Sequence, residues 1–173
     1  ENSIVSNEHD IMHVCIPYTP SFERSVINAI NEYKPKFVYI HSTVKMGTCR
    51  NIQNEVGEIA DVIYSFSTGV HPHLKQGILT FIKPICYPAP CKVHETLLND
   101  IGIPTNYIGD WENGELGKLL STTYYGYNIL FAKMVNEMCE KYGLDYSSVY
   151  SWSNETYNEG YTKLGMPHVI RPN

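Results

Sequence analysis

The segment from Glu115 to Lys141 contains Lys118, the residue whose type and surroundings most strongly suggest chemistry. No proline interrupts this segment, so it predicts one long helix. At about 100° per residue, one stripe of that helix is formed by Leu116, Leu120, Thr123, Tyr127, Leu130, Met134 and Met138. The roughly opposite stripe contains Lys118, Thr122, Tyr125 and Ile129. We therefore expect the helix to be covered on two sides.

A lysine on a covered helix face requires an anionic partner or a substrate, because an unpaired buried ammonium costs several kcal/mol. The alternative for Lys118 is a side chain that runs along the helix and brings its ammonium to water. Periodicity alone leaves both interpretations open.

Three loops follow predicted strands and contain groups that could contact a ligand. They span residues 17–20, 42–48 and 69–73. In a doubly wound sheet these loops line one crevice at the carboxyl ends of the strands. Ser42 and Thr43 offer hydroxyls to a ribose or carboxamide, and Gly47 and Thr48 could present backbone N–H groups at a helix start. The alternative is that Ser42 and Thr43 only end a strand and Thr48 only caps a helix.

His71 and His73 form a His-x-His pair, a spacing that on a strand could hold a metal. The sequence suggests no third ligand, so we interpret both as substrate-facing loop histidines and expect no metal. The five cysteines are odd in number and scattered, which favours a reducing, cytoplasmic environment.

The order of predicted elements indicates half of a doubly wound α/β sheet followed by helices. Strands are predicted at 11–16, 37–41, 61–66, 85–87 and 105–109, and helices at 21–34, 46–59, 91–98, 115–141 and 146–157. Gly143 is a plausible end for the long helix. We expect a partial Rossmann domain over residues 1–110 and a partial helical domain for dimerisation and substrate binding over residues 111–173.

Composition excludes some classes of partner. The chain has 173 residues, with 13 basic and 18 acidic side chains and a net charge of −5. No basic cluster is present, so we expect no nucleic acid partner. No apolar run approaches the roughly 18 to 20 residues of a membrane span, so we expect no membrane partner. The tyrosines of the helical part are expected to pack between helices or subunits.

Three motifs in register resemble the UDP-glucose/GDP-mannose dehydrogenase family, within the 6-phosphogluconate dehydrogenase-like superfamily. They are residues 13–17 (HVCIP), 41–48 (HSTVKMGT) and 115–122 (ELGKLLST). The family pattern is a strand ending in V-P, a strand ending in S-T-V-x-x-G-T and a long helix beginning E-x-x-K. The similarity extends over nearly the whole chain.

This resemblance implies an NAD-dependent oxidation of a sugar C6 hydroxyl in a nucleotide sugar, by a homodimer that associates through the long helix. Pro17, Tyr18 and Thr19 would approach the adenosine side of NAD, with Ser42, Thr43 and Thr48 in the second cofactor-binding motif. Lys118 would meet the substrate, beside Thr122, which stands where family members usually carry asparagine. The family's glutamate after the third strand is not evident, and His71 and His73 lie near its place.

Two family features are missing from the sequence. There is no G-x-G-x-x-G phosphate loop and no nucleophilic cysteine in a glycine-rich segment after the long helix. We therefore expect a partial chain that binds dinucleotide poorly and is inactive alone. The alternatives are a two-electron β-hydroxyacid dehydrogenase relative and a non-enzymatic dimerisation module.

Overall fold

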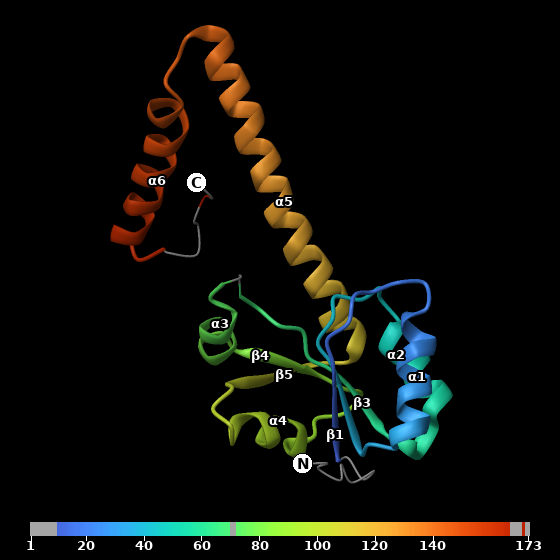
Figure 1. Cartoon of the computed structure of the whole chain (residues 1–173). Coiled ribbons are helices and arrows are strands. Elements are labelled where there is room, and N and C mark those ends of the chain that lie inside the picture. The colour runs from blue at the N-terminus through green and yellow to red at the C-terminus, as the bar shows by residue number, and fades with distance from the viewer. Residues whose placement is uncertain (1–9, 70–71, 167–170, 172–173) are drawn as a thin grey trace, which may run out of the picture. The chain divides into compact units, whose positions relative to one another are not determined.

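The computed structural model describes residues 10–69, 72–166 and 171, and it contains a five-stranded, mostly parallel sheet (Figure 1). The strands are β1 (Ile11–Val14), β2 (Phe37–Ile40), β3 (Asp61–Tyr64), β4 (Lys83–Cys86) and β5 (Thr105–Gly109), and they lie in that order across the sheet. β1, β2 and β3 are parallel, and β5 is parallel to β4. The predicted α/β fold class is confirmed.

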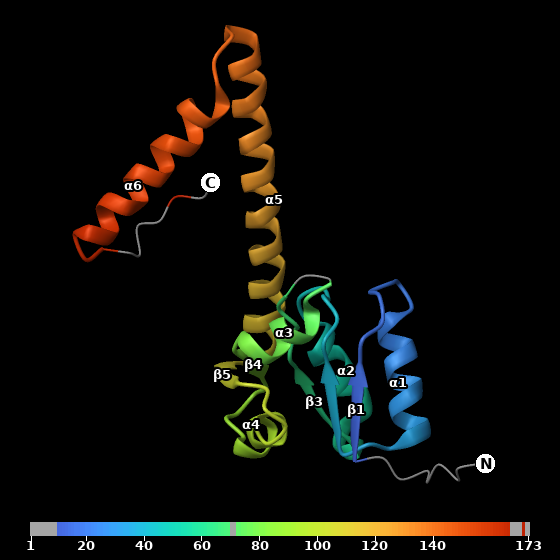
Figure 2. The ribbon, with the colours of Figure 1, turned by 60° about the vertical axis from the view of Figure 1, so that its left-hand side comes forward.

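Alternating side chains along the strands supply two apolar cores. The helices α1 (Phe22–Tyr33) and α2 (Thr48–Val56) pack against the face that carries Val38, Ile40 and Val62. A short 3₁₀ turn, η1 (Gly57–Ile59), follows α2. The helix α4 (Lys92–Asn99) packs against the other face, and Figure 2 shows α1 and α4 on opposite sides of the sheet. A strand that is buried on both faces of the sheet has a continuous run of apolar residues in the sequence. This is why the first three strands could be predicted.

β4 runs antiparallel to β3, a pairing that the sequence did not reveal. Among the described residues of the connection, the only helix is the short α3 (Leu74–Thr80), which was not predicted. β4 begins beside the carboxyl end of β3, where Lys83 contacts Phe66 and Ser67.

The long helix α5 spans Trp111–Tyr142 and begins four residues before the predicted start. A side chain at Gly114 would collide with Cys86 Sγ and would lie 2.8 Å from Tyr64 Cδ1, so only glycine lets the helix approach the sheet here. At its other end Gly143 has φ +66°, and the Leu144 N–H donates to Cys139 O, as predicted for a glycine that ends a helix.

The chain divides into two compact units, residues 1–120 and 121–173. The second contains the distal part of α5, a turn of π-helix, η2 (Ser147–Ser151), and α6 (Trp152–Lys163). The predicted boundary near residue 110 stays a prediction. No helix among the described residues is both long enough and apolar enough to cross a membrane. The described residues also contain no group of three metal-ligating side chains, and the five cysteines are free.

Candidate functional site

The first turns of α5 are attached to the sheet by side chains that recur on one helix face. Trp111 is buried, and its indole Nε1–H donates to Val62 O at 2.7 Å. Arg50 of α2 donates to Asp110 at 2.6 Å and to Glu112, and its guanidinium stacks 5.3 Å from the centre of the Trp111 ring. Together with the close approach at Gly114, these contacts fix the direction in which α5 leaves the sheet.

Glu115 connects α5 to the start of α2. Its carboxylate is fully buried and accepts backbone N–H groups from Gly47 at 2.6 Å and from Cys49 at 2.8 Å. The first N–H groups of a helix lack partners within the helix and favour negative charge. A side chain 66 to 68 positions away in the sequence therefore caps α2.

This cap corrects the expectation that Gly47 and Thr48 present N–H groups to a ligand, since the helix start already binds Glu115. The alternative, that the Thr48 side chain caps the helix, is also wrong. Gly47 is the N-cap residue, and the Thr48 hydroxyl is buried with no hydrogen-bond partner.

Lys118 lies one helical turn beyond Glu115. Its Nζ donates to the backbone carbonyl of Ser67 at 3.2 Å and lies 5.5 Å from the centre of the Phe66 ring. Phe66 and Ser67 directly follow the carboxyl end of β3. The side chain is half-buried, and both of these contacts are with neutral groups. The helix thus delivers an ammonium to the sheet edge where ligands bind in α/β folds.

The loops after β1 and β2 meet at the same edge. Ser42 Oγ donates to Ile16 O at 2.6 Å, which ties the start of one loop to the start of the other. Thr43 is exposed and carries a hydroxyl. Pro17, Tyr18 and Thr19 are exposed, and the Tyr18 ring packs against Phe22. The structure therefore ties Ser42 to the residue that precedes Pro17, and so joins the two loops.

The remaining predicted site residues do not take part in these contacts. Thr48 is only 1% exposed. His73 is exposed immediately before α3, and His71 lies outside the described residues. Thr122 follows Lys118 by one helical turn on α5, but it belongs to the second unit, where it is exposed.

A histidine pair at the same edge was not singled out by the sequence. His13 Nδ1 lies 2.9 Å from His41 Nε2, and His41 Nδ1 lies 2.6 Å from Ser65 O. Burial and the nearby Lys83 ammonium lower the pKa of His41 to about 4, and the same two causes lower the pKa of His13. Both rings are therefore neutral near pH 7.

Lys83 lies at the start of β4 and is only 6% exposed. Its Nζ donates to Phe66 O and Ser67 Oγ, each at 3.1 Å. Burial, together with the charge of Lys118, lowers its pKa to about 8. The sequence offered one signal, a lysine directly before an apolar run, but the predicted strand began two residues later. Lys83 therefore lies outside the predicted strand.

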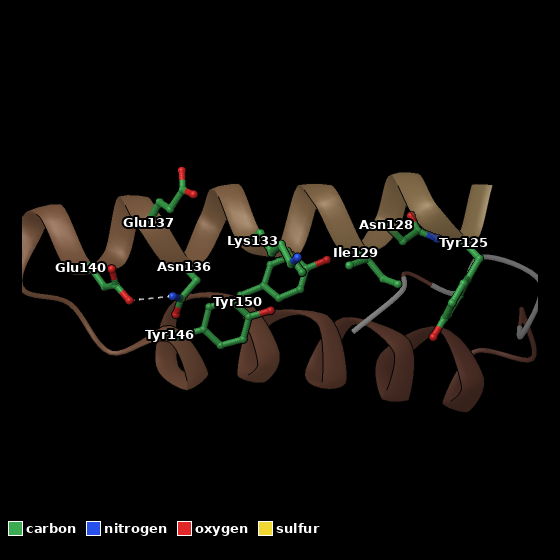
Figure 3. Close-up of a pocket in the computed structure, with 10 residues that line it drawn as sticks. Tyr125, Asn128, Ile129, Lys133, Asn136, Glu137, Glu140, Tyr146 and Tyr150 are labelled. Carbon is green, nitrogen blue, oxygen red and sulfur yellow. Dashed lines mark hydrogen bonds between the residues drawn. The ribbon is translucent and has the colours of Figure 1, made fainter. Parts of the chain in front are cut away.

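A hollow lies within the helical unit, along the face of α5 that carries Tyr125 and Ile129. It measures about 750 Å³, and Tyr146 and Tyr150 line its other side (Figure 3). Lys133 and Glu137 are exposed there, and the Asn136 amide donates to Glu140 at 2.8 Å. Nothing in this groove combines a perturbed pKa with a buried charge, so we place the candidate site at the sheet edge.

The expectation that α5 is covered on two sides is wrong for the single chain. The face with Tyr125 and Ile129 lies along the groove beside η2. The opposite stripe is exposed at every large apolar position: Leu116, Leu120, Tyr127, Leu130, Met134 and Met138.

Comparison with known proteins identifies the fold. No protein-family model and no curated protein matches the chain. Among solved structures, the UDP-N-acetyl-mannosamine dehydrogenase Cap5O from Staphylococcus aureus matches with a TM-score of 0.70 at 16% identity. The alignment covers 86% of this chain and 42% of that protein.

Two further structures share the fold. A GDP-mannose dehydrogenase from Pseudomonas aeruginosa matches with a TM-score of 0.63 at 18% identity, over 82% of this chain and 38% of its own. The 3-hydroxyisobutyrate dehydrogenase of Mycobacterium tuberculosis matches with a TM-score of 0.63 at 12% identity. That alignment covers 82% of this chain and 49% of that protein. The chain spans less than half the length of each of these three proteins, and what it shares with them is the fold.

Proposed function

We propose that this chain carries the substrate-side part of a dehydrogenase site that oxidises an alcohol of a nucleotide sugar, with NAD as the hydride acceptor. The observation that carries the proposal is the placement of Lys118 Nζ beside Ser67 O, at the edge where the loops after β1 and β2 also meet. The fold shared with dehydrogenases of UDP- and GDP-sugars supports it.

Lys118 is the residue we assign to the reacting hydroxyl. As hydride leaves the carbinol carbon, its hydroxyl oxygen gains negative charge, and a positioned ammonium stabilises that charge. The Ser67 carbonyl holds the Lys118 ammonium by a hydrogen bond, and the Phe66 ring holds it by cation–π attraction. Glu115, Trp111 and Gly114 act as positioning residues, because they fix the helix that carries Lys118.

The described residues fit one half of NAD better than the other. Thr43 offers an exposed hydroxyl for the nicotinamide riboside half, and Ser42 holds its loop to the loop that carries Tyr18, which we assign to the adenosine side. The start of α2 does not fit a pyrophosphate, because Glu115 already accepts its N–H groups. When bound, the cofactor would supply the hydride acceptor.

We further propose that the chain forms a homodimer through α5. The stripe from Leu120 to Met138 is apolar and exposed along the distal helix, with Leu130 at 56% and Met134 at 50%. A contiguous exposed apolar surface of this kind is typical of a protein–protein interface. A second copy of the same helix would cover it.

Ligand-observed NMR tests the dehydrogenase proposal without requiring turnover. UDP-glucose with NAD should bind the chain weakly, and Lys118→Met should weaken binding of UDP-glucose about tenfold, or about 1.4 kcal/mol. Lys118→Arg should retain part of the affinity, and Lys92→Met on the exposed start of α4 should leave it unchanged.

Equal affinity of Lys118→Met and the parent chain for UDP-glucose would contradict the role of Lys118. Binding of a 3-hydroxy acid in place of UDP-glucose would favour the two-electron β-hydroxyacid alternative. If neither ligand binds, a non-enzymatic dimerisation module becomes the better description. Formation of NADH from UDP-glucose by the 173 residues would overturn the prediction that they are inactive alone.

A further inference from the structure

The hydrogen bonds of His13 and His41 determine which ring nitrogens carry protons. A backbone carbonyl can only accept, so His41 Nδ1 donates to Ser65 O. Neutral His41 then has a lone pair on Nε2, which accepts from His13 Nδ1. The remaining nitrogen, His13 Nε2, is unprotonated in the neutral ring, and His13 is exposed. The chain of bonds therefore gives His13 a fixed orientation and an available nitrogen at the sheet edge.

Lys83 lies near this pair at the carboxyl end of β3. His41 Nδ1 binds Ser65 O, while Lys83 Nζ binds Phe66 O and Ser67 Oγ, so the two side chains contact three consecutive residues. The charge of Lys83 also lowers the pKa of both His13 and His41. Its two hydrogen-bond acceptors, Phe66 O and Ser67 Oγ, are neutral and use two of its three N–H groups. A buried ammonium without an anionic partner is costly, so such a charge is usually compensated.

Two side chains act on Lys83 by their charge. The Cys15 thiol, if ionised, raises the pKa of Lys83, and Lys118 lowers it. Within the described part of the chain, no aspartate or glutamate contributes to the pKa shifts of His13, His41 or Lys83. Lys83 therefore carries its charge in the interior without a carboxylate among the groups that shift its pKa.

We propose that His13 and Lys83 form a binding site for an anionic oxygen, as found in a phosphate or a carboxylate. On binding, His13 takes up a proton from solvent, and its Nε2–H then donates to the anion. Lys83 compensates the anion's charge with its remaining N–H group, and His41 acts as the positioning residue that holds the His13 ring. Anion binding and proton uptake are therefore linked, and affinity should rise as the pH falls from 8 to 6.

The test is a histidine-resolved NMR titration of the 173-residue chain at constant ionic strength, with inorganic phosphate, acetate or chloride. An anion that binds should raise the pKa of His13 by about one unit relative to chloride, equivalent to about tenfold tighter binding to the protonated ring. A larger rise with phosphate identifies a phosphate site, and a larger rise with acetate identifies a carboxylate site. The same pKa in all three salts would overturn the proposal.

Variants separate a specific site from general attraction. Lys83→Met should reduce the anion-dependent rise in the His13 pKa to a third or less, and the matched variant Lys92→Met should not change it. Since Lys83 is buried and its loss could prevent folding, the exposed variant His13→Gln provides a second measurement. It should weaken phosphate-dependent ³¹P line broadening at least fivefold, with His73→Gln as its control. Unchanged broadening with His13→Gln would contradict the site.

The anion site and the proposed dehydrogenase site depend on different ligands. Anion binding at His13 needs neither NAD nor a sugar, so the titration can succeed or fail whatever the outcome of the UDP-glucose experiment.

Discussion

The sheet unit and the helical unit use their apolar side chains in opposite ways. In the sheet unit, Val38, Ile40 and Val62 are fully buried against helices. In the helical unit, only Val135, Cys139 and Asn154 are buried among the described residues. The difference shows that the sheet unit builds its own core, whereas most large apolar side chains of the helical unit are exposed.

The helix α5 belongs to both units. From Trp111 to Leu120, α5 is held by a buried indole hydrogen bond, a buried carboxylate and a glycine against the sheet. From Ser121 onward, most of its large apolar side chains are exposed, and Val135 and Cys139 are the exceptions. We therefore expect substitutions in the first segment to change folding stability and those in the second to change association.

The largest effect is expected at Gly114, where Cys86 and Tyr64 leave no room for a side chain. Gly114→Ala should lower the free energy of unfolding by about 3 kcal/mol, because overpacking forces the helix away from the sheet. Gly117→Ala is the matched control, since a Cβ there meets open space. It should raise the helix stability by up to about 1 kcal/mol. Urea denaturation measures both, and equal values for the two variants would contradict the close packing.

Glu115→Ala should lower the free energy of unfolding by about 2 to 3 kcal/mol, because it leaves two N–H groups at the start of α2 without an acceptor. The exposed Glu55→Ala on the same α2 should change it by no more than about 0.5 kcal/mol. Thermal unfolding at neutral pH distinguishes them. A loss no greater than that of Glu55→Ala would show that the cap contributes nothing.

Acid should destabilise the sheet unit through its neutral histidines. The pKa of folded His41 is about 4, against about 6.5 when unfolded, so the unfolded state binds the proton first. Stability is complete above about pH 6.5 and is lost as the pH falls towards 4, by on the order of 2 kcal/mol.

His94 adds to this loss in acid. It is fully buried between the rings of Phe37, Tyr39 and Tyr87, both ring nitrogens lack partners, and burial lowers its pKa. Between pH 7 and 4.5, the free energy of unfolding should fall less steeply with pH for His41→Gln than for the exposed variant His73→Gln. A slope unchanged by His41→Gln would contradict the assignment.

Substitutions in the helical unit should change self-association of the chain and not its folding stability. Leu130→Glu combined with Met134→Glu should weaken self-association at least tenfold, about 1.4 kcal/mol, while the unfolding of the sheet unit stays unchanged. Lys133→Glu, on the groove side of the same helix, controls for the added charge. Analytical ultracentrifugation gives the dissociation constants. A monomeric parent chain would refute the proposed dimer.

The sequence predicted those parts of the fold that depend on local patterns. β1 to β3 and α1 were found because continuous apolar runs, Ser21 and Pro35 mark their limits. The start of α5 was missed because Asn113-Gly114 is typical of a turn, and the reason for the glycine is a contact with distant strands. α3 was missed because the Pro72-to-Gly77 stretch reads as a loop.

The site was predictable only in part for the same reason. Ser42, Thr43 and Lys118 were identified from motifs, and the structure places Ser42 and Lys118 in contact with neighbouring loops at one sheet edge. The roles of Glu115, His13, His41 and Lys83 depend on pairings between elements far apart in the chain, which periodicity does not encode.

The most direct test of the central claim, that the ligand site lies at the sheet edge beside Lys118, is backbone amide chemical-shift mapping. UDP-glucose and NAD would be titrated together into the isotope-labelled chain. We predict that the amides of Thr43, Ser67 and Lys118 shift most. Shifts confined to the groove between α5 and η2, at Tyr125, Lys133 and Tyr150, would contradict the account.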